Sequence, residues 1–111
     1  MNIIVKRAIL FYTDKYPQAS TPLLTWYAEF FKAEFGSFYK LKEVYGSASI
    51  VANRRVVFNI KGNEYRLVVS VNFKQQAAYV IWFGTHKQYD KIDVETVEFD
   101  IRILNYKAKN L

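Results

Sequence analysis

The 111-residue sequence has no cysteine, a single histidine and no long apolar run, and each of these shortages excludes a class of protein. Without cysteine, the chain can form no disulfide framework and no thiolate zinc site, and it has no cysteine nucleophile. The one histidine, His86, rules out a histidine-rich metal cluster and a two-histidine acid–base pair. A membrane span needs about 20 apolar residues, and a signal peptide needs an apolar stretch after its first charges. The sequence has neither, so we expect a soluble cytoplasmic domain without a metal site.

What the sequence does contain indicates one globular domain with an anionic partner. Hydrophobic residues make up 51% of the chain, including nine Tyr, nine Phe and two Trp, which is ample for a core and excludes disorder. Sixteen Lys and Arg outnumber ten Asp and Glu, for a net charge of +6. Most of this surplus, a net +5, lies between Arg54 and Lys91, whereas 93–100 is acidic. Such a surplus favours an anion such as nucleic acid, although many basic domains bind none.

The first half of the chain has helical periodicity. A short strand over 3–5 is followed by a helix that Pro17 ends. A second helix is expected to begin with Thr21 as N-cap and Pro22 as its first residue, and to end at Gly36.

The second half of the chain has the two-residue period of strands. After a helical turn or two over 38–45, strands are expected over 56–60, 65–73 and 77–83. Along the middle strand apolar residues alternate with polar ones, so Arg66 points away from the apolar face. The pattern predicts an α+β fold, with two N-terminal helices packed on one face of a mostly antiparallel sheet of about four strands. The opposite face is expected to be partly open to solvent.

His86, Tyr89 and Arg66 are predicted to meet on this open face. His86 follows the last strand, and Tyr89 lies three residues later on the same side of a helical turn. The three suit metal-free cleavage of an RNA phosphodiester, which needs a base for the ribose 2′-OH, an acid for the 5′-oxygen and cations for the phosphorane. His86 is the one side chain that titrates near neutrality, and nearby cations are expected to lower the pKa of Tyr89.

Each of these residues also has an ordinary structural explanation. His86 after a strand could be a structural hydrogen-bonding residue, and Arg66 an exposed strand residue. Tyr89 beside Asp90 could belong to a turn, and the basic run could be a solvated face. Spacing alone does not decide between these explanations and catalysis.

Two segments resemble the paired signature of HigB-type toxins, which belong to the RelE superfamily of mRNA interferases in type II toxin–antitoxin systems. They are Phe58-Asn59-Ile60-Lys61-Gly62-Asn63-Glu64-Tyr65-Arg66-Leu67-Val68 and Gly84-Thr85-His86-Lys87-Gln88-Tyr89-Asp90. The resemblance covers about residues 1–93, which we take as the toxin domain with a RelE-like fold. It leaves a tail at 94–111 that is either another strand or a cover for the site.

The resemblance implies an endoribonuclease that cleaves mRNA on the translating ribosome without metal or cofactor. Arg66 matches the strand arginine that stabilises the phosphate, and His86 and Tyr89 match the acid and base positions, with the division between them open. Lys61 matches a further catalytic residue of the preceding hairpin. The residues expected to contact RNA are Arg54, Arg55, Asn59, Asn63, Lys74, Lys87 and Asp90.

The same resemblance implies two partners besides mRNA, the ribosome and a cognate helix-turn-helix antitoxin of the HigA type. Two other functions stay open. The superfamily also includes non-catalytic, protein-targeting gyrase poisons, and the chain could be a basic RNA-binding module without catalysis. Gyrase poisons generally lack the strand arginine and the His/Tyr cluster, so Arg66, His86 and Tyr89 favour RNA cleavage. Salt-sensitive RNA binding without product would indicate the binding module.

Overall fold

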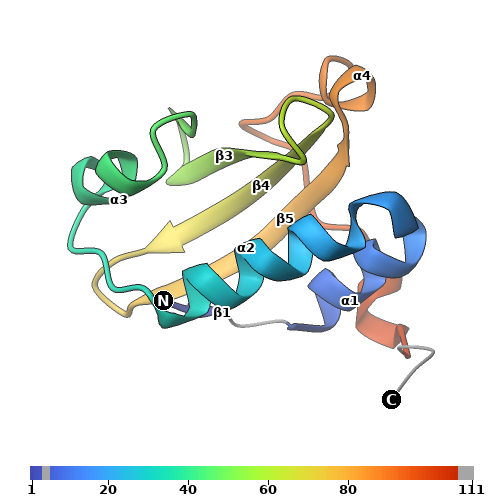
Figure 1. Ribbon diagram of the computed structural model, residues 1–111, viewed down its shortest axis with the longest axis horizontal. Coiled ribbons are helices and arrows are strands. Elements are labelled where there is room, and N and C mark those ends of the chain that lie inside the picture. The colour runs from blue at the N-terminus through green and yellow to red at the C-terminus, as the bar shows by residue number, and fades with distance from the viewer. Residues whose placement is uncertain (4–5, 108–111) are drawn as a thin grey trace.

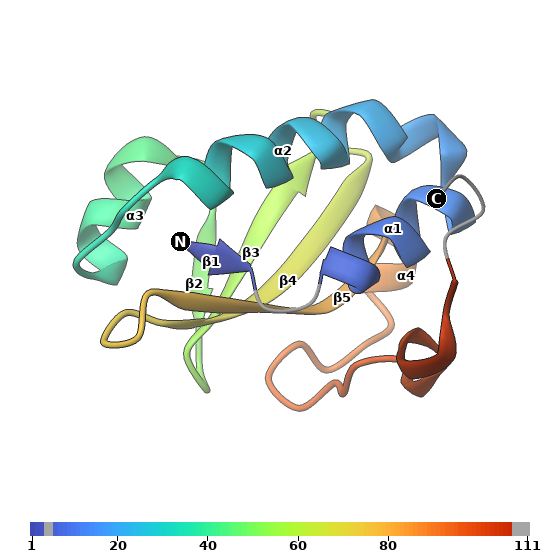
Figure 2. The same cartoon turned by 90° about the horizontal axis from the view of Figure 1, so that it is seen from below.

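The computed structural model describes residues 1–3 and 6–107, and of Ile3 only the backbone. Within these residues the elements are β1 (Asn2–Ile3), α1 (Lys6–Lys15), the 3₁₀ helix η1 (Pro17–Ala19), α2 (Ser20–Lys32), α3 (Phe38–Val44), β2 (Ser49–Val51), β3 (Arg55–Ile60), β4 (Tyr65–Asn72), β5 (Ala77–Thr85), α4 (His86–Tyr89) and the 3₁₀ helix η2 (Ile101–Asn105). Helix α2 lies over one face of the sheet, and the segment after α4 lies on the other side (Figure 1 and Figure 2). None of the described helices has the length and apolar character to cross a membrane.

The strands described form one mixed sheet in the order β1-β5-β4-β3-β2. β1 pairs in parallel with β5, and all other neighbours are antiparallel. This confirms the predicted α+β fold with a mostly antiparallel sheet, and β1 lies at one edge of that sheet. The predicted strand over 3–5 includes residues 4 and 5, which lie outside the described residues. β2 was not predicted, because three residues are too short to establish a strand period.

The alternation along β4 decides which face of the sheet the core uses. Leu67, Val69 and Val71 are buried in one cluster with Phe30 of α2. Arg66 alternates with them and therefore lies on the face away from the helices, as predicted. The face with Arg66 is polar at Asn59 and Ser70, but Val57 and Val68 on the same face are buried, with 3% and 0% exposure.

The predicted start of the second helix is wrong. α2 begins at Ser20, and its N-cap residue Ala19 has no capping side chain. The 3₁₀ turn η1 runs directly into α2, and the amide of Ser20 donates to the carbonyl of Pro17. Because this turn already supplies an acceptor at the helix start, Thr21 is not needed as a cap. Pro22 still lies in the first helical turn, where its missing N–H costs nothing.

The predicted end of the same helix at Gly36 is also wrong. α2 stops at Lys32, and Ala33 is already extended, with φ −81° and ψ 152°. The chain leaves the helix here and turns inward, so Phe35 enters the core with 6% exposure. A helical stripe would instead have buried Phe31, which is 49% exposed.

The C-terminal tail, described over residues 94–107, crosses the sheet face opposite the helices (Figure 2). It is not a strand, because 94–100 has no regular structure and η2 follows. Ile103 is buried in the core cluster with 2% exposure. At the start of β3, the Arg55 guanidinium donates to the carbonyls of Val94 (2.8 Å) and Val97 (2.7 Å).

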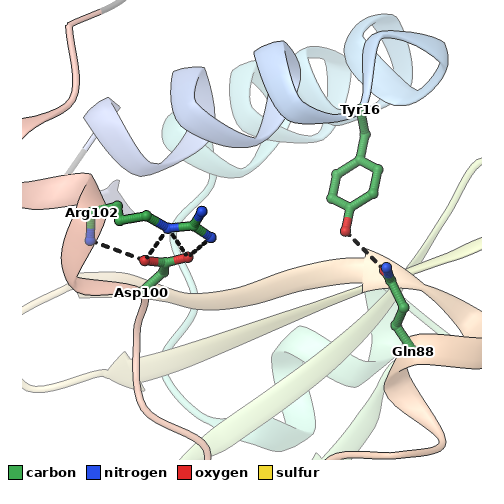
Figure 3. Close-up of polar contacts among 4 residues, drawn as sticks. All are labelled: Tyr16, Gln88, Asp100 and Arg102. Atoms are coloured by element: carbon green, nitrogen blue, oxygen red, sulfur yellow. Dashed lines mark hydrogen bonds and ion pairs between the residues drawn. The ribbon is translucent and has the colours of Figure 1, made fainter.

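A carboxylate–guanidinium pair within the tail sits beside α1. Arg102 donates to both carboxylate oxygens of Asp100 (Figure 3), and its guanidinium lies 5.6 Å from the ring centre of Phe11. The hydrogen bonds from Arg102 lower the pKa of Asp100 from 3.8 to about 2. This pair, together with Ile103, fixes the second half of the tail. The tail covers part of the open face and leaves Asn59 of β3 exposed.

Candidate active site

The predicted site residues gather where β3 ends, β4 begins and α4 follows β5. The strand register places Asn59, Arg66 and Gly84 side by side across β3, β4 and β5. Asn59 and Arg66 share the open face, because directly opposed residues point to the same side of a sheet. The β3–β4 turn lies beside α4 in the same region (Figure 1).

Helix α4 is fixed by a capping box. The Thr85 hydroxyl accepts from the amide of Gln88 (3.2 Å), and the Gln88 Oε1 accepts from the amide of Thr85 (2.9 Å). The same Oε1 accepts the hydroxyl of Tyr16 at 2.8 Å (Figure 3). The amide of His86 donates to the carbonyl of Glu64 in the β3–β4 turn, at 2.9 Å. Hydrogen bonds thereby connect α4 both to the β3–β4 turn of the sheet and to Tyr16, which follows helix α1.

Gly84 leaves the space in which this cap forms. A Cβ at this position would lie 2.6 Å from Cη2 of Trp82 and 2.7 Å from Oε1 of Gln88. Either contact is far too close for real atoms, so a larger residue would displace the indole or the cap. The arrangement of Arg66 on β4 next to α4 therefore depends on a glycine at position 84, which has no side chain.

Arg66 is held by the turn that precedes its strand. Its Nη2 donates to Oδ1 of Asn63 at 2.7 Å, and its Nη1 donates to the carbonyls of Asn63 (3.2 Å) and Tyr65 (3.1 Å). The side chain is half-buried, so the guanidinium is oriented while part of it stays open to solvent. Asn63, predicted as an RNA contact, here orients Arg66.

Tyr89 lies close enough to Arg66 for the cation to act on it, but the expected direction of its pKa is wrong. Burial raises the pKa of Tyr89 above 10, and the opposing effect of Arg66 is smaller. The negative charge of Asp90 raises the pKa further. The ring of Tyr89 lies 6.2 Å from that of Trp82 and is only partly exposed to water. Tyr89 is therefore a protonated donor at neutral pH and not a phenolate.

His86 is paired with a carboxylate one helical turn away. Its Nε2 lies 3.7 Å from Oδ1 of Asp90, and the two side chains are 45% and 63% exposed. The imidazole and the carboxylate therefore face one another across one turn of α4. Both residues line an open depression that Lys87 and Glu64 also border. The depression gives the imidazole access to a ligand.

Lys61 lies in the β3–β4 turn, where a left-handed backbone is required. Lys61 and Gly62 have φ angles of 56° and 63°, and Gly62 adopts such an angle without steric cost. The Lys61 ammonium lies 3.3 Å from the Glu64 carboxylate and its side chain is 42% exposed. The ammonium is thus held near the site.

Three predicted RNA contacts lie at the other end of the sheet. Arg54 and Arg55 adjoin the β2–β3 turn, and Lys74 lies in the β4–β5 turn. Antiparallel strands alternate in direction, so these turns are separated from α4 by the length of the eight-residue β4, roughly 25 Å. Arg55 is also bound to carbonyls of the tail. The structure therefore brings together His86, Tyr89, Arg66, Lys61, Asn59, Asn63, Lys87 and Asp90, but not Arg54, Arg55 and Lys74.

Sequence reasoning missed Tyr16 and Gln88 as residues of this region. The signal for Gln88 was present, because Thr85-His86-Lys87-Gln88 is a capping-box pattern at the start of a helix. No local pattern predicts the contact with Tyr16, which is 72 residues away in the chain.

The fold and this site define a class, a small basic α+β protein with an arginine, a tyrosine and a histidine at one end of its sheet. A family model described as HigB toxin, the RelE-like toxic component of a toxin–antitoxin system, matches residues 19–92. The chain is 35% identical over 92 residues to the mRNA interferase toxin HigB of Escherichia coli K12, covering 81% of this chain and 88% of that protein. The mRNA interferases HigB of Escherichia coli O157:H7 and Shigella flexneri match equally well, with the same identity and coverage. The chain belongs to the HigB toxin family.

Proposed function

We propose that this toxin is an endoribonuclease that cleaves mRNA. The observation that carries the proposal is the arrangement of His86, Tyr89 and Arg66 at one end of the sheet. These are a titratable imidazole, a protonated phenol and an oriented cation, the three kinds of group that 2′-OH attack on phosphorus needs. The names of the HigB relatives, all mRNA interferases, support the same reaction.

In the proposed reaction His86 is the base and Tyr89 the acid. The neutral imidazole takes the proton of a ribose 2′-OH, whose oxygen attacks the adjacent phosphorus. The Asp90 carboxylate lies 3.7 Å from Nε2, where it faces the positive charge that the ring gains in this step. Tyr89 gives its proton to the 5′-oxygen as the P–O bond breaks, which its raised pKa permits at neutral pH. The products are a 2′,3′-cyclic phosphate and a 5′-OH, and the two side chains then exchange the proton back through solvent.

Two cations stabilise the charge on the phosphorane in this proposal. The Arg66 guanidinium is oriented in advance by Asn63, so little reorganisation is needed during the reaction. Lys61 adds a second positive charge from the β3–β4 turn. Asn59 and Lys87, both exposed, contact the RNA strand on either side.

We further propose that cleavage takes place in the cytoplasm on the translating ribosome, and that a helix-turn-helix antitoxin neutralises the toxin. One general acid or base contributes about 10²–10⁴-fold, whereas correct orientation of the reacting groups is worth about 7–11 kcal/mol. A ribosome that holds the mRNA in place would supply that orientation. Free RNA is therefore expected to be cut slowly.

The test is to express the protein and to map new 5′-OH ends on cellular mRNA. His86→Ala and Arg66→Ala should abolish these ends, while Lys74→Ala, at the far end of the sheet, should leave them unchanged. Cleavage at the wild-type level by either of the first two variants would overturn the residue roles. Inhibited DNA supercoiling with intact mRNA would replace the proposal with a gyrase poison.

A further inference from the structure

Helix α4 carries His86 and Tyr89, but it is too short to hold its own shape. Four residues cannot offset the cost of helix nucleation. Its orientation must therefore be set by contacts outside the helix, and a shift of α4 would move both side chains relative to Arg66 on β4.

Gln88 makes the contacts that could set this orientation. Its side-chain Oε1 accepts from the backbone N–H of Thr85 (2.9 Å) and from the hydroxyl of Tyr16 (2.8 Å). The backbone N–H of Gln88 donates to the Thr85 hydroxyl (3.2 Å). Two of these bonds are local to α4. The third crosses the molecule to the segment between α1 and η1 (Figure 3).

Tyr16 is a rigid anchor for this third bond. Its ring packs edge-on against Tyr65 and Phe83, with both ring centres 5.7 Å away. Tyr65 and Phe83 are themselves stacked at 5.3 Å with an interplanar angle of 2°, and both are buried. The phenol oxygen of Tyr16 is thus held in place by two buried rings of the core. These rings belong to β4 and β5, the strands that also carry the site.

We propose that Tyr16 and Gln88 are positioning residues, whose hydrogen bond sets α4 and thereby places His86 and Tyr89 against Arg66. Neither side chain takes part in the proton transfers. Tyr16 lies outside the residues that the family model matches. For its effect on cleavage, the inference rests on the proposed function.

The kinetic test uses ribosomes programmed with a defined mRNA and compares kcat with KM. Tyr16→Phe removes only the hydroxyl and keeps the packed ring, and Gln88→Met keeps the side-chain length without the acceptor. Each should lower kcat by about threefold or more, the equivalent of one net hydrogen bond, with KM changed less than about twofold. The double variant should be no slower than the slower single variant, because both changes break the same bond.

Matched controls remove the same groups elsewhere. Tyr39→Phe alters a tyrosine that is 72% exposed on α3, and Gln18→Met alters an exposed glutamine of η1. Both should retain the wild-type kcat. Wild-type kcat in Tyr16→Phe and Gln88→Met would overturn the positioning role in catalysis.

A second measurement does not depend on cleavage. The chain has one histidine, so the imidazole Cε1–H resonance in an NMR spectrum reports His86 alone. This resonance should shift or broaden in Tyr16→Phe and Gln88→Met and stay in place in the two controls. An unmoved resonance in both site variants would overturn the proposal. If even the wild type cuts no mRNA, the proposed function fails, and the resonance still decides whether the bond positions His86.

Discussion

At the scale of single residues, burial outweighs nearby charge in setting the protonation state of Tyr89. Tyr89 lies beside Arg66, yet its pKa is raised because its ring is packed near Trp82 and partly removed from water. The desolvation of the phenolate outweighs the attraction of the cation. The same contact that raises the pKa therefore suits Tyr89 to donate a proton.

We predict that Tyr89→Phe lowers mRNA cleavage at neutral pH by about 10²-fold or more, the contribution of one general acid. A difference titration by ultraviolet absorbance, wild type minus variant, should show the missing tyrosine ionising above its ordinary value of 10. Because the pKa is raised, Tyr89 stays protonated throughout the neutral range, and its donor role is lost only on the alkaline side. Ionisation of the missing tyrosine below pH 10 would contradict this assignment.

Gly84→Ala is predicted to reduce both stability and activity. The new methyl group would lie 2.6 Å from the Trp82 ring and 2.7 Å from Gln88 Oε1, so one of them must move. Overpacking of this kind costs about 1–3 kcal/mol of unfolding free energy, measurable by urea denaturation. Gly36→Ala is the matched control, since a Cβ there meets nothing within 4 Å. Equal effects of the two substitutions would show that the crowding around Gly84 is not the cause.

At the scale of secondary-structure elements, the sequence predicts strands that bury one face. It does not predict helix ends that tertiary contacts determine. The alternation around Arg66 predicted β4 and its exposed face, because a slip of one residue would bury the guanidinium. The position of His86 directly after the last strand was likewise predictable from the sequence. The end of α2 was missed because burial of Phe35, a long-range effect, stops the helix. The apolar pattern of the tail resembles that of a strand, but Ile103 is buried while Phe99 and Ile101 are exposed, so the alternation does not mark a buried face.

The Asp100–Arg102 pair is predicted to contribute to stability in a pH-dependent way. The folded pKa of Asp100, about 2, is below its ordinary value of 3.8, so the contribution is complete above about pH 4 and is lost as the pH falls toward 2. Asp100→Asn should lower the unfolding free energy at pH 7 by up to about 1 kcal/mol, as expected for a pair at the surface. In urea denaturation the difference from wild type should shrink steadily below pH 4. Glu98→Gln, a neighbouring exposed carboxylate, is the control and should have no such dependence.

For the whole molecule, the net charge of +6 is less concentrated than its place in the sequence suggests. The basic run is divided between two ends of the sheet, with Lys61, Arg66 and Lys87 at the site and Arg54 and Lys74 at the far end. Positions along the chain cannot reveal this division, because hairpin turns alternate between the two ends. An RNA strand bound at the site therefore meets fewer cations than the basic segment between Arg54 and Lys91 contains.

We predict that the two ends respond differently to salt. Each cation that contacts a phosphate of single-stranded RNA adds about 0.7 to the slope of log affinity against log salt. Lys87→Ala should reduce this slope by about that amount in fluorescence anisotropy with an RNA oligonucleotide. Lys74→Ala has the same loss of charge and should leave the slope unchanged. A reduced slope in Lys74→Ala would mean that RNA follows the whole open face.

The first half of the tail is held through its backbone, and this has an evolutionary consequence. Asn53 and Arg55 donate to the main-chain carbonyls of residues 94, 95 and 97, and within the described part of the chain they donate to no side chain of the tail. Every residue type provides such a carbonyl, so most positions between 94 and 99 are free to drift. In relatives that keep a tail of this kind, the donors should persist while the tail sequence diverges around them. Homologues that lose the tail should lose Arg55 with it.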